Sequence, residues 1–233
     1  MSVLITTPAL SVFEHMALDE VLVHTCGNKM LLRFYNWQPG PAVTFGYAQS
    51  AREVRQELAA RNFTGALCRR PTGGGVVYHT DDVTFSLIFP SKSRPADIYK
   101  QLHQAVQTSL QADGLDAQLF SHKLPASAYA PSQQHRANAC FINPVENDLL
   151  GEDGQKMLGG AIRRFAQTVL YQGSLQVPNA RTTPAYQKAV IQAVRRFLAT
   201  DLHIIPADLA CLAQARQLAR TQYNTPAWTE KFE

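Results

Sequence analysis

The residues best suited to chemistry lie in the segment CRRPTGGGVVYHT, from Cys68 to Thr80. Three consecutive glycines weaken both helix and strand, so a physical reason must keep them together. Such glycines reach positive φ and can turn several backbone N–H groups to one side, which makes a site for an anion. Arg69 and Arg70 would add positive charge there, and the Thr72 hydroxyl would add a donor. The alternative is a tight turn between strands whose arginines pair with surface carboxylates.

Residues 71–75, called the glycine loop below, differ from the familiar nucleotide-binding loops. The segment lacks the Lys-Ser/Thr that follows a P-loop and the G-x-G-x-x-G spacing of a dinucleotide-binding turn. The strand expected next has Val77 and His79 on one face, with Val76 and Tyr78 on the other. His79 can therefore share a face with whatever the loop binds.

The elements that must position this loop are read from capping residues and hydrophobic periodicity. Ser11 with Glu14, and Ser50 with Glu53, have the spacing of capping boxes at helix starts. The predicted helices are 11–26, 50–61, 95–114, 183–199 and 206–223. The predicted strands are 31–37 and 42–46, joined as a hairpin by QPGP, then 65–70, 76–79, 83–89, 139–142, 147–150, 156–165 and 167–177, with 120–138 as a surface loop.

Strands paired by hairpins, without regular crossover helices between them, indicate an α+β fold with a mixed, largely antiparallel β-sheet flanked by helices. A doubly wound parallel sheet is the alternative. The 233 residues, with 45% hydrophobic and 17% charged, suffice for one domain over 1–233.

Composition also limits the partners and the compartment. No apolar run reaches the ~18 residues of a membrane span, and the N-terminus lacks the features of a secretory signal, so no membrane contact and a cytoplasmic location are expected. A net charge of +4 is too weak to indicate nucleic acid. The four cysteines show no metal-type spacing, and no metal site is expected from them.

The motifs resemble one enzyme family. RRPTGGGVVYH, with KMLGGAIRR downstream, is similar to the signature of the lipoate-protein ligase A, octanoyltransferase and biotin ligase catalytic domains. HMALDEVL, LLRFYNWQPGPAVTFGYAQ, VTFSLIFP and QYNTPAWTEKF resemble further segments of that family, so the likeness covers most of the chain. It implies a mixed sheet flanked by helices, with an acyl chain or its adenylate beside the glycine loop.

The resemblance also implies site residues. Lys156 matches the lysine that meets the reacting carbonyl, and an ammonium there would stabilise the developing oxyanion. The residues implied to bind the acyl chain or adenylate are Arg70, Thr72, Gly73, Gly74, Gly75, Val77, Tyr78, His79, Gly159, Gly160 and Ala161. Arg163 and Arg164 could face an acidic carrier protein or lie on a solvated strand edge.

Cys140 separates the branches of the family. It lies in Cys-Phe-Ile-Asn-Pro, which resembles the context of the nucleophilic cysteine in one octanoyltransferase branch. The resemblance thus implies an acyltransferase that moves an octanoyl or lipoyl group, through a Cys140 thioester, to a lysine of a lipoyl domain. The donor would be an acyl carrier protein or a lipoylated protein, and no tightly bound cofactor is implied.

Two other functions remain open at this point. Gly75 at the third glycine and the Asn147-Asp148 pair resemble the ligase branch, which would use ATP with Mg²⁺, Asp148 being a possible magnesium ligand in that case. The small C-terminal accessory domain that ligases often carry is not expected. A catalytically silent module that binds lipoylated or acyl-carrier partners is the third possibility.

Overall fold

The computed structural model describes residues 2–121 and 144–233. An eight-stranded sheet has the order β11-β1-β2-β6-β10-β9-β8-β7, and a three-stranded sheet has the order β4-β3-β5. The strands are β1 (Ser2–Thr6), β2 (Met30–Phe34), β3 (Ala42–Phe45), β4 (Ala66–Arg69), β5 (Val77–His79), β6 (Val83–Pro90), β7 (Gln118–Leu119), β8 (Leu149–Leu150), β9 (Lys156–Phe165), β10 (Thr168–Leu175) and β11 (His203–Pro206).

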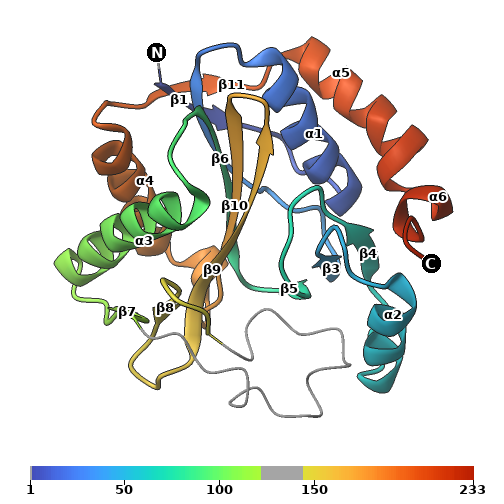
Figure 1. The fold of residues 1–233 in the computed structure, drawn as a ribbon, viewed down its shortest axis with the longest axis horizontal. Helices are drawn as coiled ribbons and strands as arrows, with labels where there is room; N and C mark the ends of the chain where they lie inside the picture. The colour runs from blue at the N-terminus through green and yellow to red at the C-terminus, as the bar shows by residue number, and fades with distance from the viewer. Residues whose placement is uncertain (1, 122–143) are drawn as a thin grey trace.

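Helices cover both faces of the large sheet (Figure 1). They are α1 (Val12–Thr25), α2 (Ala51–Ala60), α3 (Pro95–Ala112), α4 (Pro184–Leu198), α5 (Leu209–Leu218) and α6 (Pro226–Thr229), with a 3₁₀ turn η3 (Ala180–Thr182) and a π-helical turn η4 (Ala219–Tyr223). α1 and α5 pack on one face, and α3 and α4 pack on the other. The α+β fold with a mixed, mostly antiparallel sheet is confirmed.

Strand alternation explains how one sheet serves two cores. In β1, Val3 and Ile5 belong to the core under α1, whereas Leu4 between them belongs to the core under α3 and α4. Successive side chains of a strand point to opposite faces, so a short apolar run fills both layers. This sheet therefore reads as continuous hydrophobic segments such as VTFSLIF.

The local helix signals are confirmed. The Ser11 hydroxyl accepts a hydrogen bond from the Glu14 amide, and the Glu14 carboxylate accepts one from the Ser11 amide, which completes a capping box at the start of α1. At α2, Ser50 accepts from the Glu53 amide, but the Ala51 amide donates to the Glu233 carboxylate. The side chain of Glu233 therefore supplies an acceptor at this helix start.

The predicted hairpin 31–37/42–46 is wrong. β2 lies between β1 and β6 in the large sheet, whereas β3 lies between β4 and β5 in the small one. Both edges of β2 are already occupied, so the QPGP bend carries the chain to the second sheet.

The sequence reasoning also missed β1 and β11, which pair in parallel with each other. In addition, the predicted helix 206–223 starts later, at α5. The assignment of residues 1–233 to one catalytic domain stays a prediction.

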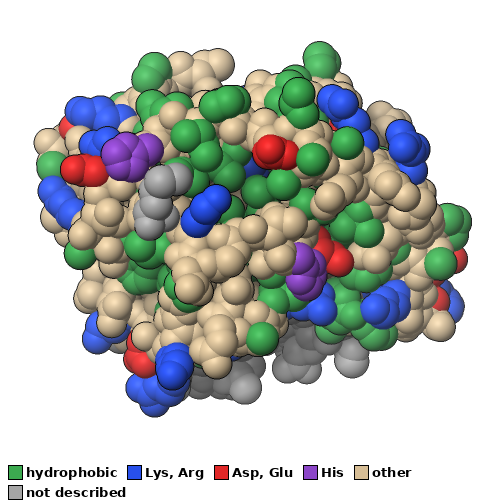
Figure 2. Space-filling model, turned by 90° about the horizontal axis from the view of Figure 1, so that it is seen from above, with side chains coloured by type: hydrophobic (Ala, Val, Ile, Leu, Met, Phe, Trp, Pro, Cys, Tyr) green, Lys and Arg blue, Asp and Glu red, His purple; other side chains and the backbone are tan. Residues whose placement is uncertain are grey.

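Charged side chains do not gather on the face shown in Figure 2, where lysines and arginines are scattered among acidic groups. Within the described residues, no helix has the length and apolar character needed to cross a bilayer.

Candidate functional site

A cavity of about 30 Å³ lies where the small sheet meets the large one. Six residues named from the sequence line it, three on the glycine-loop side and three on β9: Arg70, Val77, His79, Gly159, Gly160 and Ala161. These segments are far apart in the chain, and the two sheets bring them together. Residues of both glycine-containing motifs therefore line one cavity, and their role as one functional site stays a prediction.

The backbone of the glycine loop approaches the backbone at Gly46 closely through Gly74. Gly74 has a φ of 86°, in the region that residues with a Cβ rarely adopt. A Cβ added at Gly46, in the loop after β3, would lie 1.9 Å from the Gly74 carbonyl oxygen. At Gly73, by contrast, an added Cβ would meet no described atom within 4 Å. Glycine is thus favoured at position 74 by the backbone conformation and is needed at position 46 by the close approach of the Gly74 carbonyl.

The arginines around the loop bind backbone carbonyls. Arg70 Nη2 donates to the Gly73 and Gly75 carbonyl oxygens, each at 2.7 Å. Arg163 Nη1, on β9, donates to the Pro71 carbonyl oxygen at 3.0 Å. The loop carbonyls therefore have donors that secondary structure does not provide, as buried or close-packed backbone requires.

Arg69 does not add its charge to the cavity, contrary to the expectation from sequence. Its side chain is fully buried, and its guanidinium donates to four backbone carbonyls, those of Tyr47, Gln49, Trp228 and Thr229. Trp228 Nε1 donates back to the Arg69 carbonyl oxygen. Arg69 thus fastens the C-terminal helix α6 to the loop after β3.

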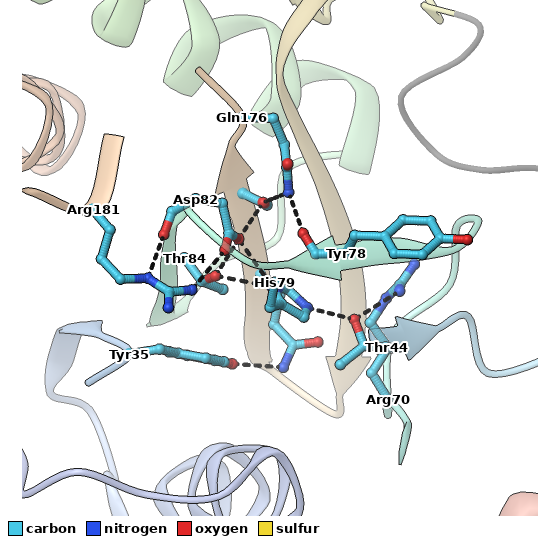
Figure 3. A network of polar contacts seen from close by, with 11 residues as sticks. Tyr35, Thr44, Arg70, Tyr78, His79, Asp82, Thr84, Gln176 and Arg181 are labelled. Atoms are coloured by element: carbon cyan, nitrogen blue, oxygen red, sulfur yellow. Dashed lines mark hydrogen bonds and ion pairs between the residues drawn. The ribbon is translucent and has the colours of Figure 1, made fainter. Parts of the chain in front are cut away.

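His79 lies in a buried polar network shown in Figure 3. Its Nδ1 is 2.9 Å from the Asp82 carboxylate, and its Nε2 is 2.9 Å from the Thr44 hydroxyl. The Trp37 ring stacks on the imidazole at 4.7 Å. Both ring nitrogens have partners, so the ring is held in place as part of the cavity wall.

A second buried network joins the glycine loop to α1. The Thr72 hydroxyl donates to Gln172 Oε1 on β10 at 2.6 Å, so it is not directed at a cavity ligand as expected. Gln172 Nε2 donates to Asp19 Oδ2 at 2.8 Å, and Asp19 also accepts from Arg33 and Tyr35. A buried carboxylate with this many donors is satisfied, and the chain of contacts fixes the start of the loop.

Lys156 and Asp148 form a buried ion pair at the start of β9. Lys156 Nζ is 2.8 Å from Asp148 Oδ2, and each side chain is only 3% exposed. Asp148 Oδ2 also accepts from the Val145 amide at 2.7 Å. Burial raises the pKa of the Asp148 carboxyl above its ordinary value, although Lys156 acts in the opposite direction.

The turn that precedes Asp148 is held by a hydrogen bond from a buried histidine, His103. Asn147 has a φ of 74°, and its carbonyl oxygen is bound by His103 Nδ1 from α3. His103 Nε2 is 2.7 Å from the Tyr171 hydroxyl. Burial lowers the pKa of His103 to about 4, although the bond to Asn147 raises it, and Lys156 lowers it further.

Several residues named from the sequence lie outside the cavity lining. Tyr78 points away from it (Figure 3), and its ring packs against Phe63. Lys156 lies on β9 three residues before the lining segment Gly159–Ala161 and does not line the cavity. The others of this kind are Thr72, Gly73, Gly74 and Gly75. Cys140 lies outside the described residues, as do 122–138 of the predicted surface loop and the predicted strand 139–142.

The sequence reasoning missed half of the cavity wall. Six lining side chains were not named: Met16, Tyr35, Thr44, Thr84, Gln172 and Ser174. Each is part of an apolar or alternating segment that predicts only helix or strand. The one available signal was polar residues inside strands that are buried on both faces, such as Gln172 and Ser174 in TVLYQGSL.

Known proteins resemble this chain in sequence and in fold. Residues 11–197 match the family model described as the lipoyl protein ligase A/B catalytic domain. The octanoyltransferase LipM of Geobacillus kaustophilus is 34% identical over 171 residues, which are 69% of this chain and 60% of that protein. The Bacillus subtilis LipM is 29% identical over 169 residues, with the same two shares. The match thus spans less than two thirds of these relatives.

Solved structures support the fold. Protein Ta0514 of T. acidophilum, with bound lipoic acid, superposes with a TM-score of 0.77 at 21% identity and 99% coverage of both chains. A lipoate-protein ligase A bound with ATP gives 0.76 at 22% identity, covering 100% of this chain and 99% of that one. At these identities, the likeness establishes a shared fold.

Proposed function

The chain belongs to the lipoyl protein ligase A/B catalytic-domain family, and we propose that it is an acyltransferase that attaches octanoyl or lipoyl groups to a lysine of a lipoyl domain. The observation that carries the proposal is the cavity, which is lined by Arg70 and Val77 on either side of the glycine loop and by the Gly159–Ala161 segment of β9. The LipM relatives, which are octanoyltransferases by name, support the choice of acyl group.

The cavity wall suits a hydrocarbon chain. Its polar side chains are bound to one another, as with Thr44 and His79, or Gln172 and Tyr35. Gly159, Gly160 and Gly173 contribute only backbone to the wall. An unbranched acyl chain gains about 0.8 kcal/mol for each CH₂ group that it buries, and it needs no polar partner along its length.

Lys156 is proposed to act on the acyl carbonyl. It lies three positions before Gly159, roughly 10 Å along an extended strand, and a lysine side chain shortens that gap. An ammonium next to the carbonyl oxygen stabilises the negative charge that develops when a nucleophile adds. Asp148 compensates the buried ammonium and, in this reading, holds it in place.

Cys140 is proposed as the nucleophile on the basis of its sequence context. Its thiolate adds to the carbonyl of an acyl thioester on the donor protein. The bond from that carbonyl to the donor sulfur breaks, and the donor thiolate leaves and takes up a proton. The amine of the acceptor lysine then forms an amide, Cys140 leaves as a thiolate, and the amine loses a proton.

Mass spectrometry tests this function directly. After incubation with octanoyl acyl carrier protein, one octanoyl group should be found on Cys140, and addition of a lipoyl domain should move it to that domain. Cys140→Ser should lose turnover, whereas Cys211→Ser, which changes a partly exposed cysteine on α5, should keep it. Efficient transfer by Cys140→Ser would refute the thioester route.

The ATP-dependent ligase is the second candidate, and Gly75 at the third position of the glycine loop favours it. The contacts of two residues argue against it: Arg70 is engaged with loop carbonyls, and Asp148 is paired with Lys156. Lipoate-dependent release of pyrophosphate that persists after alkylation of the thiols would select the ligase. ATP-independent transfer from an acyl carrier protein would select the transferase.

A further inference from the structure

Asp82, in the connection between β5 and β6, lies behind the cavity wall and not in it. Its carboxylate is almost fully buried and accepts from His79 at 2.9 Å, Ser174 at 2.6 Å, Arg181 at 3.2 Å and Thr84. Burial by itself would raise the pKa of Asp82, but His79 and the hydroxyl donors hold it below its ordinary value. Asp82 is therefore an ionised acceptor.

An ionised Asp82 determines which nitrogen of His79 carries the proton. The carboxylate can only accept, so Nδ1 must carry hydrogen and donate to it. In the neutral ring, Nε2 is then an acceptor, and the Thr44 hydroxyl 2.9 Å away donates to it. The hydrogen of Thr44 is thereby committed, which leaves the lone pairs of its oxygen to accept from another group.

Arg70 is that group, and it completes a connection to the glycine loop. Arg70 Nη1 is 3.3 Å from Thr44 Oγ1, while Nη2 binds the carbonyls of Gly73 and Gly75. Each group in this series thus donates to the next, from the arginine to the carboxylate, and Figure 3 shows the contacts between them. Arg70 and Asp82 are thus joined through the Thr44 hydroxyl and the His79 imidazole.

We propose that Asp82 is a positioning residue that fixes the glycine loop at the acyl site through His79, Thr44 and Arg70. It touches neither the cavity nor the loop, and it acts by setting the direction of each hydrogen bond between them. Gly73 and Gly75 flank Gly74, so the guanidinium holds the loop on both sides of its residue of positive φ. The effect on acyl transfer rests on the proposed function, whereas the coupling to the loop does not.

The first test is NMR on the full chain and needs no enzymatic activity. With ¹⁵N-labelled histidine, His79 should appear as the tautomer protonated at Nδ1. In Asp82→Asn, the amide resonances of Gly73 to Gly75 should shift, and Thr44→Val should shift the same resonances. A ring protonated at Nε2 in the wild type, or glycine amides unmoved in Asp82→Asn, would overturn the proposal even if the protein proves to be inactive.

The second test is a double-mutant cycle on acyl transfer. Asp82→Asn and Thr44→Val should each lower kcat/KM about 10- to 100-fold, the range expected for a small misplacement of an active-site group. The double variant should lose no more than Thr44→Val alone, because Asp82 acts through Thr44. Strictly multiplicative losses would mean that Asp82 stabilises the fold independently of the loop, and would reject the proposal.

A matched control is the neighbouring carboxylate. Asp81 accepts from the Asn179 amide and has no part in the series, so Asp81→Asn should keep wild-type activity and glycine resonances. If Asp82→Asn does not fold, Thr44→Val alone still tests the series, since it replaces a hydroxyl by a methyl group of similar size. A Thr44→Val variant with an unchanged loop spectrum would refute the coupling.

Discussion

Acid should destabilise this protein through His103, which is fully buried between α3 and the large sheet. Its Nδ1 donates to the Asn147 carbonyl and its Nε2 accepts from the Tyr171 hydroxyl, so the folded protein holds a neutral ring. Burial lowers its pKa from 6.5 to about 4, the Asn147 bond partly opposes this, and Lys156 lowers it further. The unfolded chain therefore takes up this proton at a higher pH than the folded one does.

The sign and size of the effect follow from this difference. The contribution of His103 is complete above pH 6.5 and is lost as the pH falls from 6.5 to about 4. Each pH unit in that window corresponds to about 1.4 kcal/mol. The whole difference is therefore about 3 kcal/mol, a large part of the stability of an ordinary domain.

Urea denaturation of wild type and His103→Gln between pH 7 and pH 4 measures this contribution. Glutamine can donate and accept as the neutral ring does, but it does not titrate, so the variant should lose about 3 kcal/mol less on acidification. The pKa of His15 is also lowered, mainly by burial, and its contribution has the same sign in both proteins. His203→Gln, on the exposed strand β11, should match wild type. Equal acid sensitivity of His103→Gln and wild type would refute the reasoning.

Two further predictions concern packing and charge at the site. Gly46→Ala should lower the melting temperature and the rate of acyl transfer, because its Cβ would collide with the Gly74 carbonyl. Gly73→Ala places its Cβ in open space and should have the melting temperature of the wild type. Equal melting temperatures for all three proteins would contradict this prediction. Asp148→Asn should cost about 3 kcal/mol in urea denaturation, since it leaves a buried ammonium without its carboxylate. Asp113→Asn, which breaks an ion pair with the 60% exposed Lys188, should cost less than about 1 kcal/mol, and equal losses would disprove the role of burial.

The fold was predictable where local signals decide structure. Ser11 with Glu14 marks the start of α1 because a side chain satisfies the first free amides of a helix, and Pro95 marks the first turn of α3. Pairing of distant strands has no such local signal. β1 lies between β2 and β11, which come from opposite ends of the chain, and no periodicity within a short apolar segment indicates those neighbours.

The site was predictable in its motifs but not in its polar contacts. The motif around the glycine loop and the Gly159–Ala161 segment were located from their sequences, and the fold brings Arg70, Val77 and His79 of the first motif to one cavity with that segment. Gln172 and Thr44 are separated from the loop by many residues, whereas Asp82 follows its last glycine by seven, and each of the three lies in a segment that predicts only strand or turn. Their roles come from hydrogen-bond geometry, which depends on the packing of the two sheets.

The arginines show why residue type alone misleads at such a site. An Arg-Arg pair before three glycines suggests charge for an anionic substrate, yet a glycine-rich segment outside regular structure has carbonyls that no ladder satisfies. Arg70 binds two of them, and Arg163 binds a third. Among the described residues, no backbone carbonyl accepts a hydrogen bond from the amide of Gly73, Gly74 or Gly75. The arginines therefore order the backbone of the loop from its carbonyl side, and anion binding by its N–H groups stays a prediction.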